Sequence, residues 1–404
     1  MSSTLEWMIF QRIFGYGTTR GQKLLERFGS PERLLAAYVP QMEPGEPFTK
    51  TELSKLSERS RYEQWAERTL ERCWKLGCQV LTPDSPQYPA RLRNIYSFPA
   101  VLYVLGELGE IDEQPAIAVV GTRKCTDYGR RAAEEFSWEL ARRGVIIVSG
   151  LALGIDSISQ EAALKAGGRT IAVLGNGIDT VYPAQHRPLH RAILERGGAV
   201  VSEYPPQEGA QPFFFPLRNR IISGLSLGTL VVEGTRHSGS LITAGHAVTQ
   251  NRDVFAVPGS IYSPQSAGPN WLIGQGALPV SSWEEILAQY PWLTFSEPKE
   301  QPPLQISFDN PTPSVYNGQK GASSRPQKQK KACGSEAPKG GKTEAPSYLT
   351  ENQRRIFELL GEEPVSADRI VEQTGLPVPV VLANLTQLEI FGLVRTHPGR
   401  RFSR

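Results

Sequence analysis

The chain has 404 residues, 39% of them hydrophobic and 21% charged, which is enough for two or three domains with a full-sized core. The formal net charge of +3 does not by itself predict a nucleic-acid partner, so any basic site must be local. The four cysteines lack paired metal-ligand spacing, and the longest apolar run is about half a membrane span. With no signal-peptide pattern at the N-terminus, we expect a cytoplasmic protein without a metal, a cofactor or a membrane partner.

Residues 1–80 are expected to form a helical domain. Leu5 to Phe14 is amphipathic, a Gly15-Tyr16-Gly17 turn follows, and Gly21 to Phe28 leads to a helix start at Ser30-Pro31-Glu32. Two short helices around a Gly-x-Gly turn can present backbone N–H groups to a phosphate. No cluster of lysines accompanies this turn, so a tight helix–helix turn that needs glycine is the favoured alternative.

Residues 81–297 are expected to form the second domain, and within it Pro115 to Trp283 repeat a pattern of strand, glycine-rich turn and helix. Continuous apolar runs predict strands at Ala116–Val120, Val145–Ser149, Thr170–Leu174, Ala199–Ser202, Thr229–Glu233 and Val254–Pro258. Apolar runs that do not alternate with polar residues are typical of a parallel sheet that is covered on both faces. Helical segments such as Arg130–Arg143 and Ile155–Ala166 supply the crossovers, and Ser240–Gln250 supplies another. We therefore predict an α/β fold with a Rossmann-like, doubly wound, mostly parallel sheet.

Small residues follow the predicted strands at the carboxyl edge of the sheet, where open α/β sheets bind their ligands. The candidates are Gly121-Thr122-Arg123, Gly150, Gly154, Gly175 and Ser238-Gly239-Ser240. Small residues let a ligand approach the backbone, and helix N-termini offer free N–H groups to anions. Each glycine alone is better explained as a turn residue. Their coincidence along one edge favours an extended polyanion over a single nucleotide.

The segment Phe213–Ser226 is predicted to begin as a loop and to enter the sheet from Ile221 onward. Phe214 is a candidate for stacking on a base, although the three phenylalanine rings at 213–215 also fit a role in capping the hydrophobic core. In an extended chain Arg218 and Arg220 point the same way, toward the crevice. The alternative is that both arginines bond to loop carbonyls or to Glu233. Asn219, which lies between them, completes the candidate DNA-binding set of this segment.

No motif supports a common enzyme class. There is no Gly-x-x-x-x-Gly-Lys-[Ser/Thr] loop, and no Gly-x-Gly-x-x-Gly follows a strand. The Gly-x-Ser-x-Gly match at 224–228 precedes a predicted strand, whereas a nucleophile elbow follows one. The alternative function is a nucleotide- or phosphate-metabolising enzyme that uses the same crevice, with Asp156, Asp179 and Glu233 as its acids.

Two further regions follow the α/β part. Residues 298–347 are rich in Pro, Gly, Ser, Gln and Lys, which predicts a disordered linker. Residues 348–404 predict a winged helix with helices at Leu349–Leu360, Ser366–Gly375 and Val378–Phe391 and a hairpin that turns at Pro398-Gly399. The third helix carries no Lys or Arg, which argues against reading a DNA duplex, but the wing is rich in arginine. Contact with DNA and contact with protein are therefore equally expected of this module.

A series of short motifs in order resembles the bacterial DNA-processing family DprA, also called Smf. The motifs are Ala118-Val119-Val120-Gly121-Thr122-Arg123, Thr126-Asp127-Tyr128-Gly129, Ser149-Gly150-Leu151-Ala152-Leu153-Gly154-Ile155-Asp156, Ala172-Val173-Leu174-Gly175-Asn176-Gly177-Ile178-Asp179, Tyr182-Pro183, Ser202-Glu203-Tyr204-Pro205, Arg218-Asn219-Arg220-Ile221-Ile222, Ser238-Gly239-Ser240-Leu241 and Val257-Pro258-Gly259. The flanking parts resemble that family's SAM-like helical domain and its winged helix.

The resemblance implies a function and site residues. It implies a non-enzymatic protein that binds and protects single-stranded DNA during natural transformation and loads the RecA recombinase. It further implies a homodimer formed through the Rossmann-like domain. Arg123, and Arg187 after the Tyr182-Pro183 motif, correspond to basic residues that hold DNA phosphate in the family. The chain departs from the pattern at Ser159-Gln160, where the family usually shows Ala-His, and at His186, where it usually shows Asn.

Overall fold

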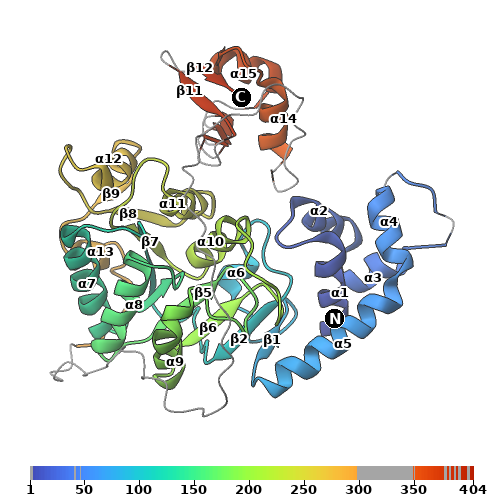
Figure 1. Ribbon diagram of the computed structural model, residues 1–404, viewed down its shortest axis with the longest axis horizontal. Helices are drawn as coiled ribbons and strands as arrows, with labels where there is room; N and C mark the ends of the chain where they lie inside the picture. Colours follow the sequence, from blue (N-terminus) through green and yellow to red (C-terminus); the bar gives the residue numbers. More distant parts are fainter. Residues whose placement is uncertain are drawn as a thin grey trace, which may run out of the picture.

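A computed structural model gives the architecture of the chain (Figure 1). It describes residues 3–297, except 41 and 46, and residues 349–404, except short breaks at 350, 377–379, 382–383, 386–387, 390–392 and 398–400. The predicted linker, 298–347, lies outside the described residues.

The N-terminal part is helical, and its first three helices confirm the prediction. The helices are α1 (Thr4–Phe14), α2 (Thr19–Phe28), α3 (Pro31–Ala36), α4 (Lys50–Ser57) and α5 (Arg59–Lys75). Side chains of Ser3, Thr18, Ser30 and Thr49 cap the first four helices by accepting backbone N–H groups. A capped first turn fixes where each helix begins, which explains why helix starts were readable in the sequence.

A nine-stranded sheet forms the middle of the molecule, in the order β1-β2-β6-β5-β4-β3-β7-β8-β9. The strands are β1 (Gln79–Leu81), β2 (Leu102–Gly106), β3 (Ala116–Val120), β4 (Ile146–Ser149), β5 (Thr170–Leu174), β6 (Ala199–Ser202), β7 (Gly228–Val231), β8 (Asp253–Ala256) and β9 (Leu278–Pro279). From β6 to β9 every pairing is parallel, and β1 and β2 extend one side as antiparallel strands. The predicted strands and the mostly parallel fold are confirmed, whereas β1, β2 and β9 were not predicted.

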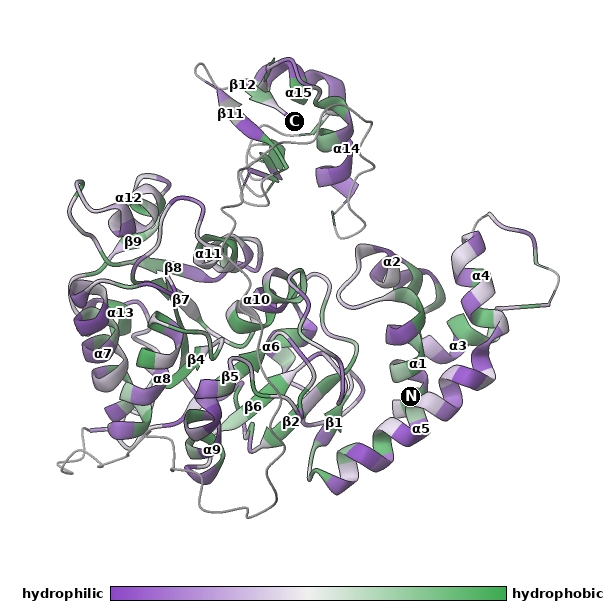
Figure 2. Ribbon diagram, viewed as in Figure 1, coloured by the Kyte–Doolittle hydropathy of each residue, from purple (hydrophilic) through white to green (hydrophobic). Residues whose placement is uncertain are grey.

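Helices cover both faces of the sheet, as continuous apolar strands require. The helices of this part are α6 (Ala90–Arg93), α7 (Asp127–Arg142), α8 (Ile155–Lys165), α9 (Arg187–Glu195), α10 (Phe214–Gly224), α11 (Gly239–Thr249), α12 (Ala267–Gly274) and α13 (Trp283–Leu287). Along β3, Ile117 and Val119 pack with α7 and α8, while Ala118 and Val120 pack with α10 and α11. The hydrophobic strands therefore lie between helices whose outer surfaces are largely hydrophilic (Figure 2).

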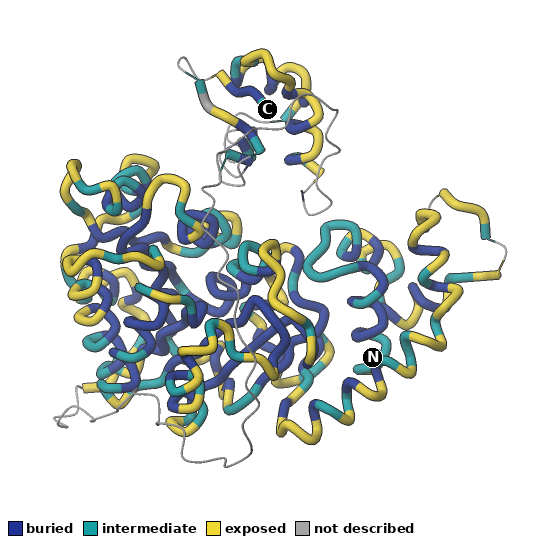
Figure 3. The backbone as a smooth tube through the Cα atoms, viewed as in Figure 1, coloured by how far each residue is buried: buried dark blue, intermediate teal, exposed yellow. Residues whose placement is uncertain are grey.

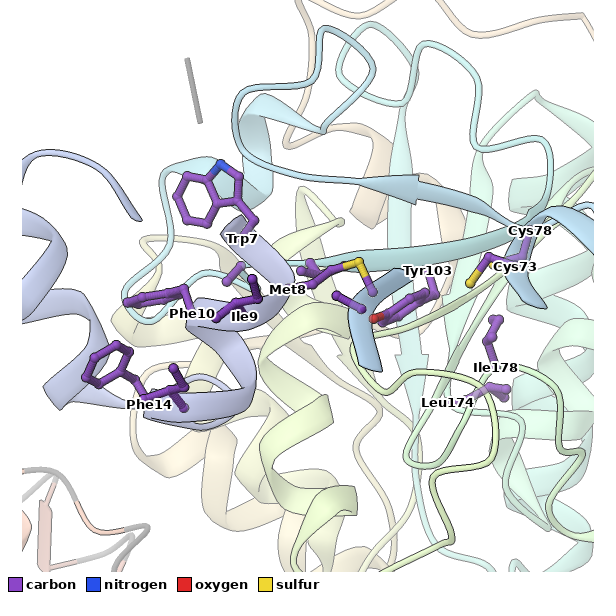
Figure 4. Close-up of a cluster of buried hydrophobic side chains, with 14 of the residues drawn as sticks. Trp7, Met8, Ile9, Phe10, Phe14, Cys73, Cys78, Tyr103, Leu174 and Ile178 are labelled. Atoms are coloured by element: carbon purple, nitrogen blue, oxygen red, sulfur yellow. The ribbon is translucent and has the colours of Figure 1, made fainter. Parts of the chain in front are cut away.

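The helical domain and the sheet share one hydrophobic core. Met8 of α1 is fully buried and belongs to the same cluster as Tyr103 of β2 and Leu174 of β5 (Figure 4). The indole N–H of Trp7 donates to the Asp84 carboxylate at 2.9 Å, which adds a polar contact across the boundary. Figure 3 shows α1 largely buried against its surroundings, whereas α5 exposes one side along its length. The helical domain is therefore packed onto the sheet through α1.

The segment that follows Phe213 corrects a prediction, because it forms helix α10 and not a loop that enters a strand. Pro216 lies in the first turn, where a backbone N–H has no partner within the helix, so proline is tolerated there. Phe214, Ile221 and Ile222 are all buried. A helix that is buried on several sides has the apolar composition of a buried strand, which explains the error.

The C-terminal module contains α14 (Glu351–Leu359), α15 (Ala367–Thr374) and a sheet ordered β10-β12-β11. Its strands are β10 (Val365–Ser366), β11 (Arg395–His397) and β12 (Arg401–Ser403). The first two helices and the paired strands β11 and β12 match the predicted winged helix. The predicted turn at Pro398-Gly399 lies outside the described residues, and the predicted third helix falls partly outside them. Among the helices that the structure describes, none has the length and apolar character of a membrane span.

Candidate nucleic-acid interface

The predicted small residues do gather at one edge of the sheet. Strands β5, β4, β3 and β7 are neighbours and run parallel, so the loops after them lie side by side. The N–H of Ile155, the first residue of α8, donates to the carbonyl of Thr122 at 3.2 Å and joins the loops after β4 and β3. Gly154 allows this approach, because a Cβ there would overlap the Thr122 carbonyl. The structure thus forms a common edge from motifs that are distant in the sequence.

Glu233, at the end of the β7 segment, organises the loop that carries Arg123. Its carboxylate accepts the backbone N–H of Thr126 at 2.8 Å and the Thr126 hydroxyl at 2.6 Å, and its own carbonyl accepts the Thr122 N–H at 2.8 Å. Glu233 is 1% exposed, whereas Arg123 is exposed. A buried acid therefore fixes both ends of a short loop whose arginine faces solvent.

Phe215, which sequence reasoning did not select, provides the aromatic ring of this edge. The Arg123 guanidinium lies 5.7 Å from the centre of the Phe215 ring, within cation–π distance. The centre of the Tyr182 ring lies 5.6 Å from the centre of the same Phe215 ring. A Cβ at Gly175 would lie 2.8 Å from Phe215, so the glycine makes room for the ring. Phe215 is half-buried and thus keeps part of its surface accessible.

The choice of Phe214 as the stacking residue is corrected by its burial. Phe214 is 3% exposed and stacks on Tyr204 with 3.9 Å between ring centres. It fills the interior on the side of the helical domain, as the core-capping alternative predicted. Successive residues of a helix point about 100° apart, so only one of the two neighbouring rings reaches the edge.

Arg218 lies beneath the edge as a buried clamp. Its guanidinium donates to the Gly150 carbonyl at 2.9 Å and to the Val173 carbonyl, while Asp156 accepts the Gly150 N–H at 3.1 Å. Gly150 is held from both sides, and a Cβ there would lie 2.6 Å from both Arg218 and Asp156. Desolvation lowers the pKa of Arg218 to about 10, against the opposing charge of Asp156, and the same burial raises the pKa of Asp156.

Arg220 points away from the edge, which corrects the expectation that both arginines face the crevice. Its guanidinium donates to Glu203 at 2.7 Å and to the Ser97 carbonyl at 2.9 Å, and both charged side chains are buried. Residues two apart in a helix diverge by about 200°, whereas an extended chain would align them. Both arginines instead bond to backbone carbonyls, as the alternative interpretation predicted. The acid that takes part is Glu203 and not Glu233.

Of the remaining predicted residues, Arg187 and the Ser238-Gly239-Ser240 segment lie at helix starts, and Asn219 lies within α10. Ser238 caps α11, Ser240 is buried, and Gly239 has open space where a Cβ would be. The Asn219 amide donates to the Gly239 carbonyl at 3.2 Å and links α10 to this helix start. Arg187 is exposed at the first residue of α9.

The two departures from the family pattern have structural roles here. The His186 ring nitrogen Nδ1 lies 2.9 Å from the Leu151 carbonyl and ties the start of α9 to the loop after β4. Ser159 and Gln160 are fully buried; Ser159 donates to the Asp156 carbonyl and Gln160 to the Ile171 carbonyl.

The acids of the alternative enzymatic function all have structural partners. Asp156 and Glu233 hold the loops described above, and Asp179 accepts the Gln207 N–H at 2.8 Å. Ser226 of the Gly-x-Ser-x-Gly match is fully buried and donates to the Ile222 carbonyl. Within the described part of the chain, no group of three or more His, Cys, Asp or Glu side chains is arranged to hold a metal ion.

Comparison with known proteins agrees with this architecture. Residues 79–291 match the family described as DNA recombination-mediator protein A, and residues 340–400 match the DprA winged helix domain. The chain belongs to the DprA family. The Smf protein of Synechocystis sp. is 35% identical over 409 residues, covering 98% of each chain. The Escherichia coli Smf protein is 40% identical over 329 residues, covering 81% of this chain and 78% of that protein.

A solved DprA structure supports the same relationship. The X-ray structure of DprA from Streptococcus pneumoniae aligns with a TM-score of 0.60 and 33% sequence identity, covering 71% of this chain and 98% of that one. The DprA fold accordingly accounts for the Rossmann-like sheet and its flanking helices.

Proposed function

We propose that this DprA-family protein binds single-stranded DNA along the carboxyl edge of its sheet. The observation that carries the proposal is Arg123, an exposed cation on a loop that Glu233 holds in place. The neighbouring Phe215 ring and the open backbone at Gly239 add a stacking surface and one N–H group at a helix start. A basic residue, an aromatic face and backbone donors along one groove are the usual components of sequence-tolerant single-strand binding.

The phosphate contacts are assigned to the exposed residues of the predicted set. Arg123 and Arg187 bind phosphate through their guanidinium groups, and Gly239 binds it through its N–H at the start of α11. The neighbouring N–H groups of Ser238 and Ser240 already donate to the Thr235 carbonyl and to the Ser238 hydroxyl. Arg218 and Arg220 are supporting residues in this proposal, because both are already engaged inside the protein. Gly121, Gly150, Gly154 and Gly175 support the site indirectly, because they make room for the Ile155, Arg218, Thr122 and Phe215 atoms that pack beneath this edge.

The wider role follows from the family. Relatives at 44% identity carry the names DNA processing protein DprA in Bacillus subtilis and in Streptococcus pneumoniae. We infer that this protein protects incoming DNA during natural transformation and loads RecA onto it, as a homodimer and without catalysis. Gel filtration with and without RecA, in the presence of an oligonucleotide, tests the partnership and the oligomeric state together.

The test of the DNA site is a salt titration of binding to a fluorescent oligonucleotide by the full chain. Arg123→Ala is expected to weaken binding to all sequences about equally and to reduce the slope of log K against log salt by roughly one unit. Arg196→Ala, at an exposed arginine that follows α9, is the matched control and should change neither quantity. Equal affinity of Arg123→Ala and wild type at several salt concentrations would remove Arg123 from the site.

A further inference from the structure

We propose that helix α10 couples the N-terminal helical domain to the DNA groove, with Arg220 and the Gly15–Gly17 turn as positioning elements. The inference rests on the proposed function, because it concerns the affinity of the same groove. Residues of α10 alternate between two neighbours: Phe214 and Arg220 contact the helical-domain side, while Phe215 and Arg218 lie at the groove. One rigid element therefore touches both parts.

The contacts on the helical-domain side are specific. The Tyr16 ring packs edge-on against Tyr204 at 4.8 Å and against Phe214 at 5.7 Å. A Cβ at Gly17 would overlap the Arg220 guanidinium, so the turn requires glycine in order to admit this side chain. The turn that resembled a phosphate-binding hairpin thus packs against α10 and its neighbours. This supports the tight-turn alternative.

A chain of hydrogen bonds strengthens the connection. Gln22 of α2 accepts the Ser97 N–H at 2.6 Å, and the Ser97 carbonyl accepts from Arg220 at 2.9 Å. Arg220 in turn donates to Glu203, which is fully buried. A buried ion pair tolerates little displacement, because moving one partner leaves the other charge unpaired. The orientation of α10 is consequently held by Glu203 and Ser97, and Ser97 is in turn tied to the helical domain through Gln22.

The same helix fixes three features of the groove. Phe215 lies against Arg123, Arg218 holds the Gly150 carbonyl, and Asn219 donates to the Gly239 carbonyl. A shift of α10 therefore moves the aromatic face, the floor and a helix start together. Preorganised groups bind more tightly than groups that must be ordered on binding, so release of the turn lowers affinity without removing any phosphate contact.

Tyr16→Ala in the full chain tests the coupling. We expect single-stranded DNA affinity to fall about fivefold or more, with the salt slope unchanged, because no cation is lost. In a Phe215→Ala background the same change should cost less affinity than in wild type, because one of the three features that α10 positions is already gone. Leu34→Ala, in the buried core of the helical domain and outside the turn, is the control for lost stability alone.

The outcomes separate the two proposals. Equal affinity of Tyr16→Ala and wild type, or an equal loss in Leu34→Ala, would overturn the coupling while leaving the DNA site intact. Failure of the wild type to bind any oligonucleotide would overturn the proposed function and this inference with it. Should Tyr16→Ala fail to fold, Gln22→Leu removes the acceptor for the Ser97 N–H together with an exposed hydrogen bond to Glu26, and the same fall in affinity and unchanged salt slope are expected.

Discussion

Glu233 offers a test in which two physical arguments predict opposite results. Replacing it with leucine removes both acceptors of Thr126 and one negative charge near the proposed phosphate site. Electrostatics alone predicts tighter DNA binding, because a carboxylate repels phosphate. Loss of the brace on the Arg123 loop predicts weaker binding. Glu233→Gln removes the same charge but keeps an oxygen for the Thr126 N–H and an amide for its hydroxyl.

The magnitudes follow from the two hydrogen bonds. Each bond to a charged acceptor contributes about 1.5–3 kcal/mol, and part of this is offset by the cost of burying the carboxylate. We expect Glu233→Leu to lower the free energy of unfolding by about 2–4 kcal/mol. Reordering even one residue of the released loop on binding costs about 1–2 kcal/mol, which is about 5- to 30-fold in affinity.

Urea denaturation and fluorescence anisotropy with a labelled oligonucleotide measure the two effects on the same samples. The bracing argument predicts that Glu233→Leu binds more weakly than wild type and that Glu233→Gln binds as well or better. If both variants bind more tightly than wild type to the same extent, charge alone governs the site. The bracing role of Glu233 is then refuted.

Two further predictions concern stability. Gly239→Ala is expected to leave the free energy of unfolding unchanged or to raise it by up to about 1 kcal/mol, because its Cβ meets no atom and alanine favours helix. Its affinity for single-stranded DNA is expected to fall. Urea denaturation and fluorescence anisotropy measure these two quantities, and a change of both in the same direction would contradict the prediction. Burial lowers the pKa of His246 to about 4 in the folded chain. As pH falls below about 6.5, this histidine therefore binds a proton in the unfolded chain before it does so in the folded chain, and the folded chain loses stability. Between pH 7.5 and 4.5, wild type should therefore lose roughly 2–3 kcal/mol more unfolding free energy than His246→Gln, with the exposed His237→Gln as a control that behaves as wild type.

The parallel strands were readable because their signal is local. Each of β3, β5 and β6 is a short, fully buried run of mostly apolar residues with a glycine-containing turn on at least one side, and the structure gives them the predicted bounds. The antiparallel pair β1 and β2 lacks that repeat: only the four-residue helix α6 lies between the two strands, and no helix lies between β2 and β3. Their place in the sheet depends on a long-range pairing with β6, which composition does not reveal.

Helix α10 could not be read from sequence for a different reason. Its charged side chains are satisfied by partners far away in the chain: Arg218 by Gly150 and Arg220 by Glu203. Buried guanidinium groups are tolerated only where carbonyls or carboxylates meet them, and those partners are known only once the fold is known. The pattern of two arginines among apolar residues signalled something unusual. It did not specify which surface each arginine faces.

The glycines of the edge now separate into two kinds, and this sharpens the argument for a polyanion. A Cβ at Gly121 would lie 2.5 Å from Ile155, and those at Gly150 and Gly175 would lie within 3 Å of Arg218 and Phe215. These glycines are explained by close packing inside the protein and carry no information about a ligand. Gly239 has no such neighbour, yet it lies at the start of α11, where its own N–H points out of the helix while the Ser238 and Ser240 N–H groups are bonded within the loop. The case for phosphate binding through the backbone therefore rests on Gly239 far more than on the number of glycines along the edge.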